Sequence, residues 1–323
     1  MTMREALRIL VTVFACAVAL PGFAADYPQR AVRLLIPYPP GGAGDIVGRL
    51  ISSRLSEVLG QQVVIDNRGG GAQVIATQLA ATAPPDGYTL FLASATHSVN
   101  AALRPKLPYD SIKDFAPITL VAQSALVFVA NPSLGVSTIK ELIATAKAKP
   151  GRINYASSGP GTGGHMSVEL LKSRTGIDLV HIPYKGASPA LVDVIAGQVQ
   201  MICTSPLAAM PHVKSGKLRA LATTGPRRIA SAPDVPTVAE TLPGYESALW
   251  YALLAPAGTP PPIVRRLHDE TVKIVKSRDV AQQLEGQGAE PVGGTAEELQ
   301  KFIRTEIAQW VRLAKEAKLT LND

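Results

Sequence analysis

Two glycine-rich loops contain the residues whose types and spacing best suit chemistry in this chain. The first spans residues 37–45 and reads PYPPGGAGD, and the second spans residues 157–165 and reads SSGPGTGGH. Each loop follows a strand-like run and leads into a stretch with helical spacing. Glycines leave backbone N–H groups unobstructed, and a helix N-terminus behind them favours a negative charge. The two loops therefore predict a pair of anion-binding nests.

Polar side chains in these loops have several possible roles. Asp45 is predicted to cap the helix that follows it rather than to act as a catalyst. Ser157 and Thr162 would add hydroxyl donors to the second nest. His165 is either a ligand contact at the start of a helix or a packed cap.

The second loop also has the glycine spacing of a dinucleotide-binding motif, at Gly159, Gly161 and Gly164. The strand that follows ends in PYK at residues 183–185, without the acidic residue that would bind a ribose hydroxyl. No G-x-S-x-G elbow, H-E-x-x-H motif or Walker lysine occurs in the sequence. We therefore expect a binding protein rather than an enzyme, with no cofactor and no metal.

Two further residues stand near predicted strands. His97 follows the strand that ends at residue 93, so it either reaches the ligand cleft or is a buried structural histidine. Cys203 belongs to a buried-looking strand and is predicted to be a small apolar core residue.

Alternating strands and helices must position the loops. Strand-like runs at residues 32–36, 63–66 and 89–93 alternate with helix-like stretches at 45–59 and 74–83. This βαβαβ order predicts an α/β fold with a mostly parallel sheet and helices on both faces. A second series of the same kind extends from residues 116–130 to residues 199–203. In such sheets ligands bind at the carboxyl ends of the strands, where both loops stand.

The C-terminal segment predicts helices that need a sheet to cover, and the first domain's sheet is the expected one. The chain would then cross between domains near residues 123–128 and again near residues 247–253. We expect domain 1 to comprise residues 26–125 and 248–323, and domain 2 to comprise residues 126–247. Two doubly wound domains joined by a two-strand hinge form a clamshell.

The first 25 residues predict a signal peptide. Arg4 and Arg8 precede a short apolar run, and small residues place cleavage near Ala24 or Ala25, so the protein is expected in the periplasm. Lipidation at Cys16 is the less favoured alternative. The net charge of +7 includes no basic run longer than a pair, and aromatic residues make up 5% of the chain, so nucleic acid is not an expected partner.

Short motifs throughout the mature length resemble the Bug family, the extracytoplasmic receptors of tripartite tricarboxylate transporters. They are YPPGG at 38–42, DNR at 66–68, APPDGYT at 83–89, YASSG at 155–159, PYKG at 183–186, GKLRALA at 216–222, PDVPT at 233–237 and LAPAGTP at 254–260. The resemblance implies a type II periplasmic-binding-protein fold. It also implies a carboxylate held between the two loops and delivered to a membrane permease by a transiently bound, monomeric receptor.

The resemblance extends the predicted site to the ends of neighbouring strands. From domain 1 the site comprises Tyr38, Pro40, Gly41, Gly42, Gly44, Asp45, Ser94, Thr96 and His97; from domain 2 it comprises Ser157, Ser158, Gly161, Thr162, His165, Tyr184 and Thr204. A carboxylate-sensing receptor for a signalling system is the main alternative. An enzyme that uses His97 or His165 as its base is a weaker one.

Three departures from the family pattern bear on the ligand. Thr204 and Ser205 stand where relatives tend to carry an Asp-Asn pair, so an unaminated carboxylate is expected rather than an amino acid. The loop at residues 69–74 lacks the usual Pro and Asn, and Gly163 and Gly164 replace bulkier polar residues. The last two changes suggest a wider cleft, which would suit an aromatic acid, whereas the resemblance itself implies a dicarboxylate or a tricarboxylate.

Overall fold

The computed structural model describes residues 27–230, 232–286 and 288–317 of the 323-residue chain. The predicted signal peptide, its cleavage site and the lipidation alternative at Cys16 lie outside the described residues. Within the described part, none of the helices combines the length and the hydrophobicity that a bilayer crossing requires.

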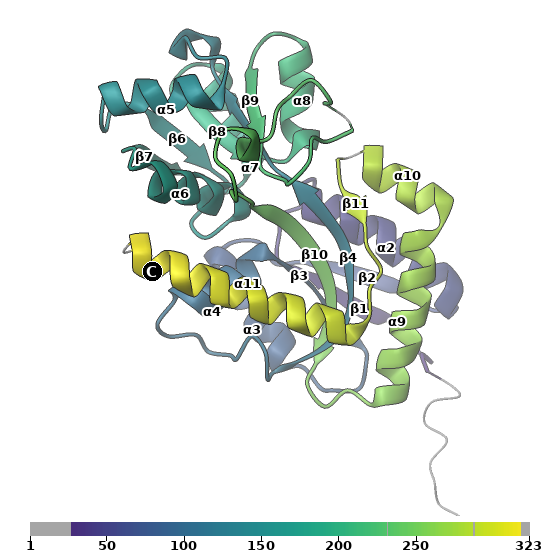
Figure 1. Ribbon diagram of the computed structural model, residues 1–323. Helices are drawn as coiled ribbons and strands as arrows, with labels where there is room; N and C mark the ends of the chain where they lie inside the picture. The colour runs from purple at the N-terminus through teal and green to yellow at the C-terminus, as the bar shows by residue number, and fades with distance from the viewer. Residues whose placement is uncertain (1–26, 231, 287, 318–323) are drawn as a thin grey trace, which may run out of the picture.

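The first sheet has six strands and forms the centre of what we call lobe 1 (Figure 1). Its order is β11-β4-β10-β3-β1-β2. The strands are β1 (Val32–Ile36), β2 (Val63–Asn67), β3 (Thr89–Ser94), β4 (Phe115–Ala125), β10 (Ala248–Pro256) and β11 (Glu290–Pro291). Strand β1 is parallel to β2 and β3, whereas β10 is antiparallel to β3 and β4. The helices are α2 (Ala43–Leu59), α3 (Val74–Ala81), α4 (Ala95–Leu103), α9 (Pro261–Lys276), α10 (Arg278–Gly286) and α11 (Ala296–Ala317).

The second sheet has five strands in the order β7-β6-β8-β5-β9 and forms lobe 2. Its strands are β5 (Val127–Ala130), β6 (Asn154–Ser157), β7 (Val180–Pro183), β8 (Met201–Thr204) and β9 (Arg219–Thr223). Its helices are α5 (Ile139–Ala148), α6 (Gly163–Thr175), α7 (Ala187–Ile195) and α8 (Pro206–Lys214). Strands β6, β7 and β8 are parallel, and β5 is antiparallel to β8 and β9. The predicted α/β fold with two sheets is confirmed.

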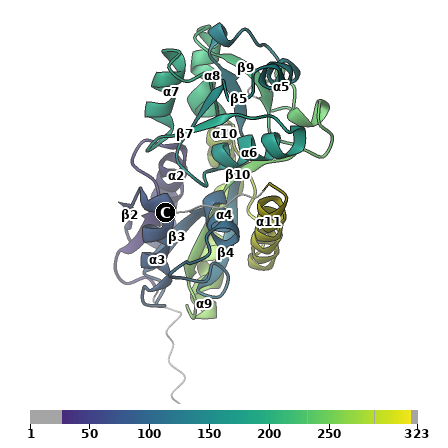
Figure 2. The same cartoon turned by 90° about the vertical axis from the view of Figure 1, so that its left-hand side faces the viewer.

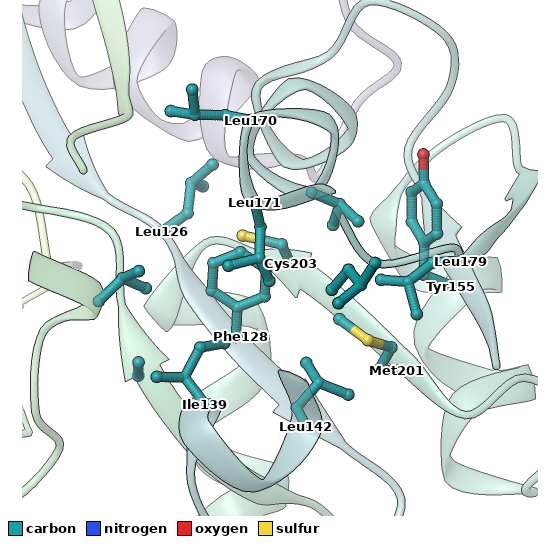
Figure 3. Packing of buried hydrophobic residues seen from close by; sticks show 14 of the residues in the cluster. Leu126, Phe128, Ile139, Leu142, Tyr155, Leu170, Leu171, Leu179, Met201 and Cys203 are labelled. Atoms are coloured by element: carbon teal, nitrogen blue, oxygen red, sulfur yellow. The ribbon is translucent and has the colours of Figure 1, made fainter. Parts of the chain in front are cut away.

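Each sheet is covered by apolar side chains from its helices. In lobe 2, Phe128 of β5 packs between Leu171 of α6 and Leu142 of α5, with Met201 of β8 in the same cluster (Figure 3). Cys203 is 2% exposed and belongs to the same core, as predicted. Strand β1 is a nearly continuous buried run, which is typical of a strand covered on both faces.

The chain passes between the sheets twice. The first passage joins β4 to β5 at Leu126, and the second leads from lobe 2 into β10. Strands β4 and β10 pair with each other as far as Ala125 and Ala248, so the two connections lie side by side (Figure 1). The predicted domain boundaries at residues 125 and 248 are compatible with this arrangement, and we keep them as a proposal.

The C-terminal helices pack on lobe 1, as predicted, but α11 also reaches lobe 2. Leu299 and Ile303 in its first half belong to a core of lobe 1. Trp310 and Leu313 in its second half belong to the core of lobe 2 together with Leu170 of α6. Helix α11 therefore lies along both lobes on the side shown in Figure 1.

Candidate functional site

Strand β10 brings the two glycine-rich loops together. A methyl group added to Gly44, at the start of α2, would lie 3.2 Å from the Tyr251 ring. A methyl group added to Gly163, at the start of α6, would lie 3.8 Å from Leu249 Cδ1. Leu249 and Tyr251 are two residues apart on β10, so their side chains share one face of the strand about 7 Å apart. The N-termini of α2 and α6 thus converge on neighbouring positions of a strand that links the lobes.

Asp45 holds the first loop in shape. Its carboxylate accepts hydrogen bonds from the Gly41 N–H (2.9 Å), from Arg49 Nε (2.8 Å) and from Asn67 Nδ2 (2.9 Å). Burial opposes ionisation of this group, but the hydrogen bonds from Arg49, Gly41 and Asn67 outweigh it and lower its pKa. The N-cap of α2 is Gly42 rather than Asp45, so the predicted cap was wrong in position. The Gly41 N–H is already occupied and does not face a ligand.

The amides that follow are available. Among residues 27–230, 232–286 and 288–317, none accepts a hydrogen bond from the N–H groups of Ala43 or Gly44. Gly44 also permits close contact, because a methyl group there would lie 2.4 Å from the Tyr38 ring. The first nest therefore consists of the first turn of α2 with Tyr38 against it.

A polar cluster surrounds the Tyr38 hydroxyl. Strands β1 and β3 are parallel neighbours, so Tyr38 after β1 lies beside Ser94 and Thr96 after β3. Burial raises the pKa of Tyr38, while hydrogen bonding to Ser94, Gln73 and Thr96 opposes the increase. Ser94 Oγ also donates to Gln73 Oε1 at 3.0 Å. These four side chains form one group at the carboxyl edge of the sheet.

Gln73 was not predicted from the sequence to be a site residue. It is 6% exposed and has φ 69°, and the preceding Ala72 has φ 47°. Left-handed conformations are rare for residues other than glycine and concentrate at functional sites. The only signal in the sequence was that the loop at residues 69–74 departs from the family pattern.

The second loop is bound mainly to itself. Ser157 Oγ accepts from the Gly159 N–H (3.1 Å), and Thr162 Oγ1 donates to the Gly159 carbonyl (2.8 Å). The Gly161 N–H donates to His165 Nδ1 at 3.0 Å. The hydroxyls of Ser157 and Thr162 therefore shape the loop instead of pointing freely at a ligand. Within the described residues, the N–H groups of Gly163 and Gly164 have no acceptor.

The end of β8 lies beside this loop, because β6 and β8 are parallel neighbours. Thr204 is 5% exposed at the end of β8. A methyl group on Gly164 would lie 2.0 Å from the Cys203 carbonyl oxygen. Close packing of α6 on β8 thus explains Gly164, and the suggestion that this glycine widens the cleft was wrong.

Three predicted residues lie apart from this arrangement. His97 is 1% exposed, its Nε2 contacts the Ser111 carbonyl at 2.9 Å, and burial lowers its pKa to about 4. It is a core histidine beside Phe115. Of the two roles considered for it, this is the buried structural one. The Tyr184 hydroxyl donates to Asp193 at 2.6 Å, and this bond raises the pKa of Tyr184 to about 12. Pro40 is exposed at the outer tip of the first loop.

A serine and a histidine contact each other in lobe 2. Ser157 Oγ lies 2.6 Å from His181 Nε2. Ser157 is fully buried, and burial together with His165 lowers the pKa of His181 to about 3, which makes it a poor base near neutral pH. Across the described ranges, no cluster of three or more His, Cys, Asp or Glu side chains could hold a metal ion.

A cavity of about 640 Å³ lies elsewhere, between α11 and the strands that link the lobes. Its walls include Ser124, Glu246 and Trp310, and none of the predicted site residues contributes to it. The converging helix N-termini, rather than this cavity, therefore carry the candidate site.

Comparisons with known proteins agree along the whole chain. The profile of the tripartite tricarboxylate transporter family receptor matches residues 47–319. The protein BugT of Bordetella pertussis is 37% identical over 326 residues, which cover 100% of both chains. The solved structure of R. palustris Rpa4515 with adipate has a TM-score of 0.87 at 37% identity, over 91% of this chain and 99% of that one. MatC (Rpa3494) from Rhodopseudomonas palustris with bound malate has a TM-score of 0.83 at 32% identity, over 89% and 99%.

Proposed function

We propose, from the premise that this chain belongs to the tripartite tricarboxylate transporter family of receptors, that it binds a small carboxylate between its two lobes. The ligand would lie between the first turns of α2 and α6. Closure of the lobes on the ligand would then present a new surface to a membrane permease. The fold class and the family support this proposal, and the site residues are our own assignment.

The convergence of α2 and α6 on β10 is the observation that carries the proposal. Free first-turn amides at Ala43, Gly44, Gly163 and Gly164 would donate to the carboxylate, and the helix dipoles would add to the attraction. Micromolar affinity requires about 8 kcal/mol, and each hydrogen bond to a charged group contributes about 1.5 to 3 kcal/mol. Four or five such bonds are therefore sufficient if closure itself costs little.

Polar side chains beside these amides would complete the site. In lobe 1 they are Tyr38, Gln73, Ser94 and Thr96, of which Ser94 donates to Gln73 at 3.0 Å. In lobe 2 they are Ser158 and Thr204, at the ends of adjacent strands. We exclude His97, which is buried with its Nε2 at the Ser111 carbonyl, and Tyr184, whose hydroxyl donates to Asp193.

A dicarboxylate is the ligand class that we favour. Two structural relatives were solved with adipate and with malate. Thr204 and Ser205 offer hydroxyls but no carboxylate that would pair with an amino group. Arg49, one turn further along α2, is paired with Asp45 at 2.8 Å. Neutral donors would therefore bind the ligand, together with bridging water.

Export to the periplasm, a monomeric state and delivery to a permease complete the proposed role. A receptor that reports carboxylate to a signalling system would use the same binding site. Recovery of a permease subunit or of a sensor kinase with the purified receptor would separate the two. An enzymatic role is not favoured, because the Ser157 and His181 pair is buried and His181 has a pKa of about 3.

Calorimetry with adipate, malate, benzoate and aspartate tests the proposal. We expect binding of a dicarboxylate in the micromolar range, weaker binding of benzoate and none of aspartate. Gly44→Ala should weaken binding at least tenfold, because the added methyl displaces the Tyr38 ring that lies 2.4 Å from it.

Gly286→Ala provides the control, since nothing lies within 4 Å of a methyl group there. It should bind as the wild type does. Small-angle scattering should show compaction when the ligand is added. Full affinity in Gly44→Ala, or failure of every carboxylate to bind the wild type, would contradict the proposal.

A further inference from the structure

Two imidazole rings are stacked behind the second loop. His165 of α6 and His181 of β7 have ring centroids 4.1 Å apart and planes inclined by 17°. The ring of Tyr155 from β6 lies 4.9 Å from that of His181, on a nearly parallel plane. His165 is 8% exposed. Three elements of lobe 2 therefore contribute to one packed stack of rings.

Each imidazole is bound to the loop that follows β6. His165 Nδ1 accepts the Gly161 N–H at 3.0 Å. His181 Nε2 lies 2.6 Å from Ser157 Oγ, and this oxygen accepts the Gly159 N–H at 3.1 Å. Two of the glycine amides are thereby turned toward the stack. The bonds also fix the direction of the chain as it enters α6, where the free amides begin.

We propose that His165 and His181 act as positioning residues, a neutral stacked pair that sets the conformation of the second ligand loop and causes ligand affinity to fall in acid. This inference rests on the proposed function of that loop. Neither ring needs to touch the ligand.

The geometry requires His165 to be neutral and opposes a charge on both rings at once. Nδ1 of His165 accepts the hydrogen bond from the Gly161 N–H only while it is itself unprotonated. Two imidazolium ions at 4.1 Å would repel each other. Protonation would therefore release Gly161 and separate the rings, and the loop would lose its shape.

Neighbouring groups keep the rings neutral at ordinary pH. Burial and the charge of Lys172 lower the pKa of His165 to about 4. Burial, His165 and Lys172 lower the pKa of His181 to about 3, although Glu169 opposes them. Glu169 accepts hydrogen bonds from Tyr155 (2.6 Å) and Lys172 (2.8 Å), which disperses its charge. Affinity should accordingly be constant near pH 7 and should fall as the pH approaches 4.

Two kinds of variant test the inference: one loses a hydrogen bond of the stacked pair, and the other keeps the hydrogen bonds but cannot be protonated. His181→Phe keeps a ring for the stack but loses the contact with Ser157, and we expect the dissociation constant for adipate or malate at pH 7 to rise about fivefold. The double variant H165N/H181Q keeps an amide atom for each bond but does not titrate. It should bind within about twofold of the wild type at pH 7, with a flatter profile between pH 7 and pH 3.5. Titration of the ligand itself is common to both proteins and cancels in the comparison.

His212→Gln, near the C-terminal end of α8, provides the control and should follow the wild type at every pH. Wild-type affinity in His181→Phe, or parallel pH profiles for the wild type and the double variant, would overturn the inference.

If no carboxylate binds the wild type, the proposed function fails but the inference about the loop can still be tested. The rate of amide hydrogen exchange in residues 157–165 of the ligand-free protein then tests whether the two histidines hold the loop in shape. Exchange about fivefold faster in His181→Phe than in His212→Gln supports it, and equal exchange overturns it.

Discussion

Glu306 is a half-buried carboxylate with no basic partner among the residues that the structure describes. Its Oε2 accepts from Trp250 Nε1 at 3.1 Å and from Trp310 Nε1 at 3.4 Å. Burial raises the pKa of Glu306, and the charge of Glu246 adds to the increase. Because the pKa in the folded state lies above that in the unfolded state, this carboxyl stabilises the fold below about pH 4.3. That contribution is lost as the pH rises through the folded-state pKa.

Glu306→Gln should therefore stabilise the protein at neutral pH. The amide oxygen still accepts both indole bonds, and no charge is left beside the two indoles. We expect the free energy of unfolding at pH 7 to rise by about 1 kcal/mol and the difference to vanish near pH 4. Urea denaturation at both pH values measures this. Glu297→Gln, exposed on the same helix, should change little. A loss of stability in Glu306→Gln would mean that the charge has a favourable partner.

At the scale of elements, the close packing of α6 on β8 depends on one glycine. A methyl group on Gly164 would lie 2.0 Å from the Cys203 carbonyl oxygen, a backbone atom that cannot move away alone. Gly164→Ala should therefore displace α6 and lower the free energy of unfolding by about 2 to 3 kcal/mol. The neighbouring Gly163→Ala meets only Leu126 Cδ1 at 3.3 Å and Leu249 Cδ1 at 3.8 Å, which can shift. We expect it to cost less than about 1 kcal/mol.

Thermal and urea unfolding of the two alanine variants provide the comparison. Equal stabilities would show that α6 can slide on β8 without cost, contrary to the packing described. Gly163→Ala should still weaken ligand binding, since its amide lies at the proposed site. The pair therefore separates the packing role of one glycine from the binding role of its neighbour.

Elements and residues differed in how well the sequence predicted them. The strands around Leu34, Phe91 and Ile202 and the helices between them were predicted because hydrophobic spacing is a local property. The direction of a side chain is not local, so His97 and Tyr184 were placed in the site although their polar atoms bind Ser111 and Asp193. His181 and Gln73 were missed for the same reason. Their partners come from loops 20 or more residues away, Ser157 for the first and Ser94 for the second.

At the scale of the whole molecule, the two connections between the lobes are tied together by Thr224. Its Oγ1 accepts from the Leu126 N–H at 2.8 Å and donates to the Ser247 carbonyl at 2.6 Å. On the other side, Ser124 Oγ donates to the Gly288 carbonyl of lobe 1 at 2.7 Å. Leu126 and Ser247 are thus fixed to lobe 2, and Ser124 is fixed to lobe 1. Rotation of the lobes would be confined to the bonds around Ala125 and Ala248.

Thr224→Val should loosen this junction, because valine has the shape of threonine but no hydroxyl. The Leu126 N–H would be left buried without its partner, at a cost of about 1 to 3 kcal/mol, and the two connections would be held together only by the main-chain bonds of residue 224 to Leu126 and Ser247. We expect lower stability in urea and a wider range of lobe separations in the ligand-free protein, measured between spin labels on α5 and α9. Thr223→Val is the matched control, because its hydroxyl makes only a 3.5 Å contact with the Pro236 carbonyl, which also accepts the Thr223 N–H. A distance distribution in Thr224→Val as narrow as that of Thr223→Val would place the pivot elsewhere than at residues 125 and 248.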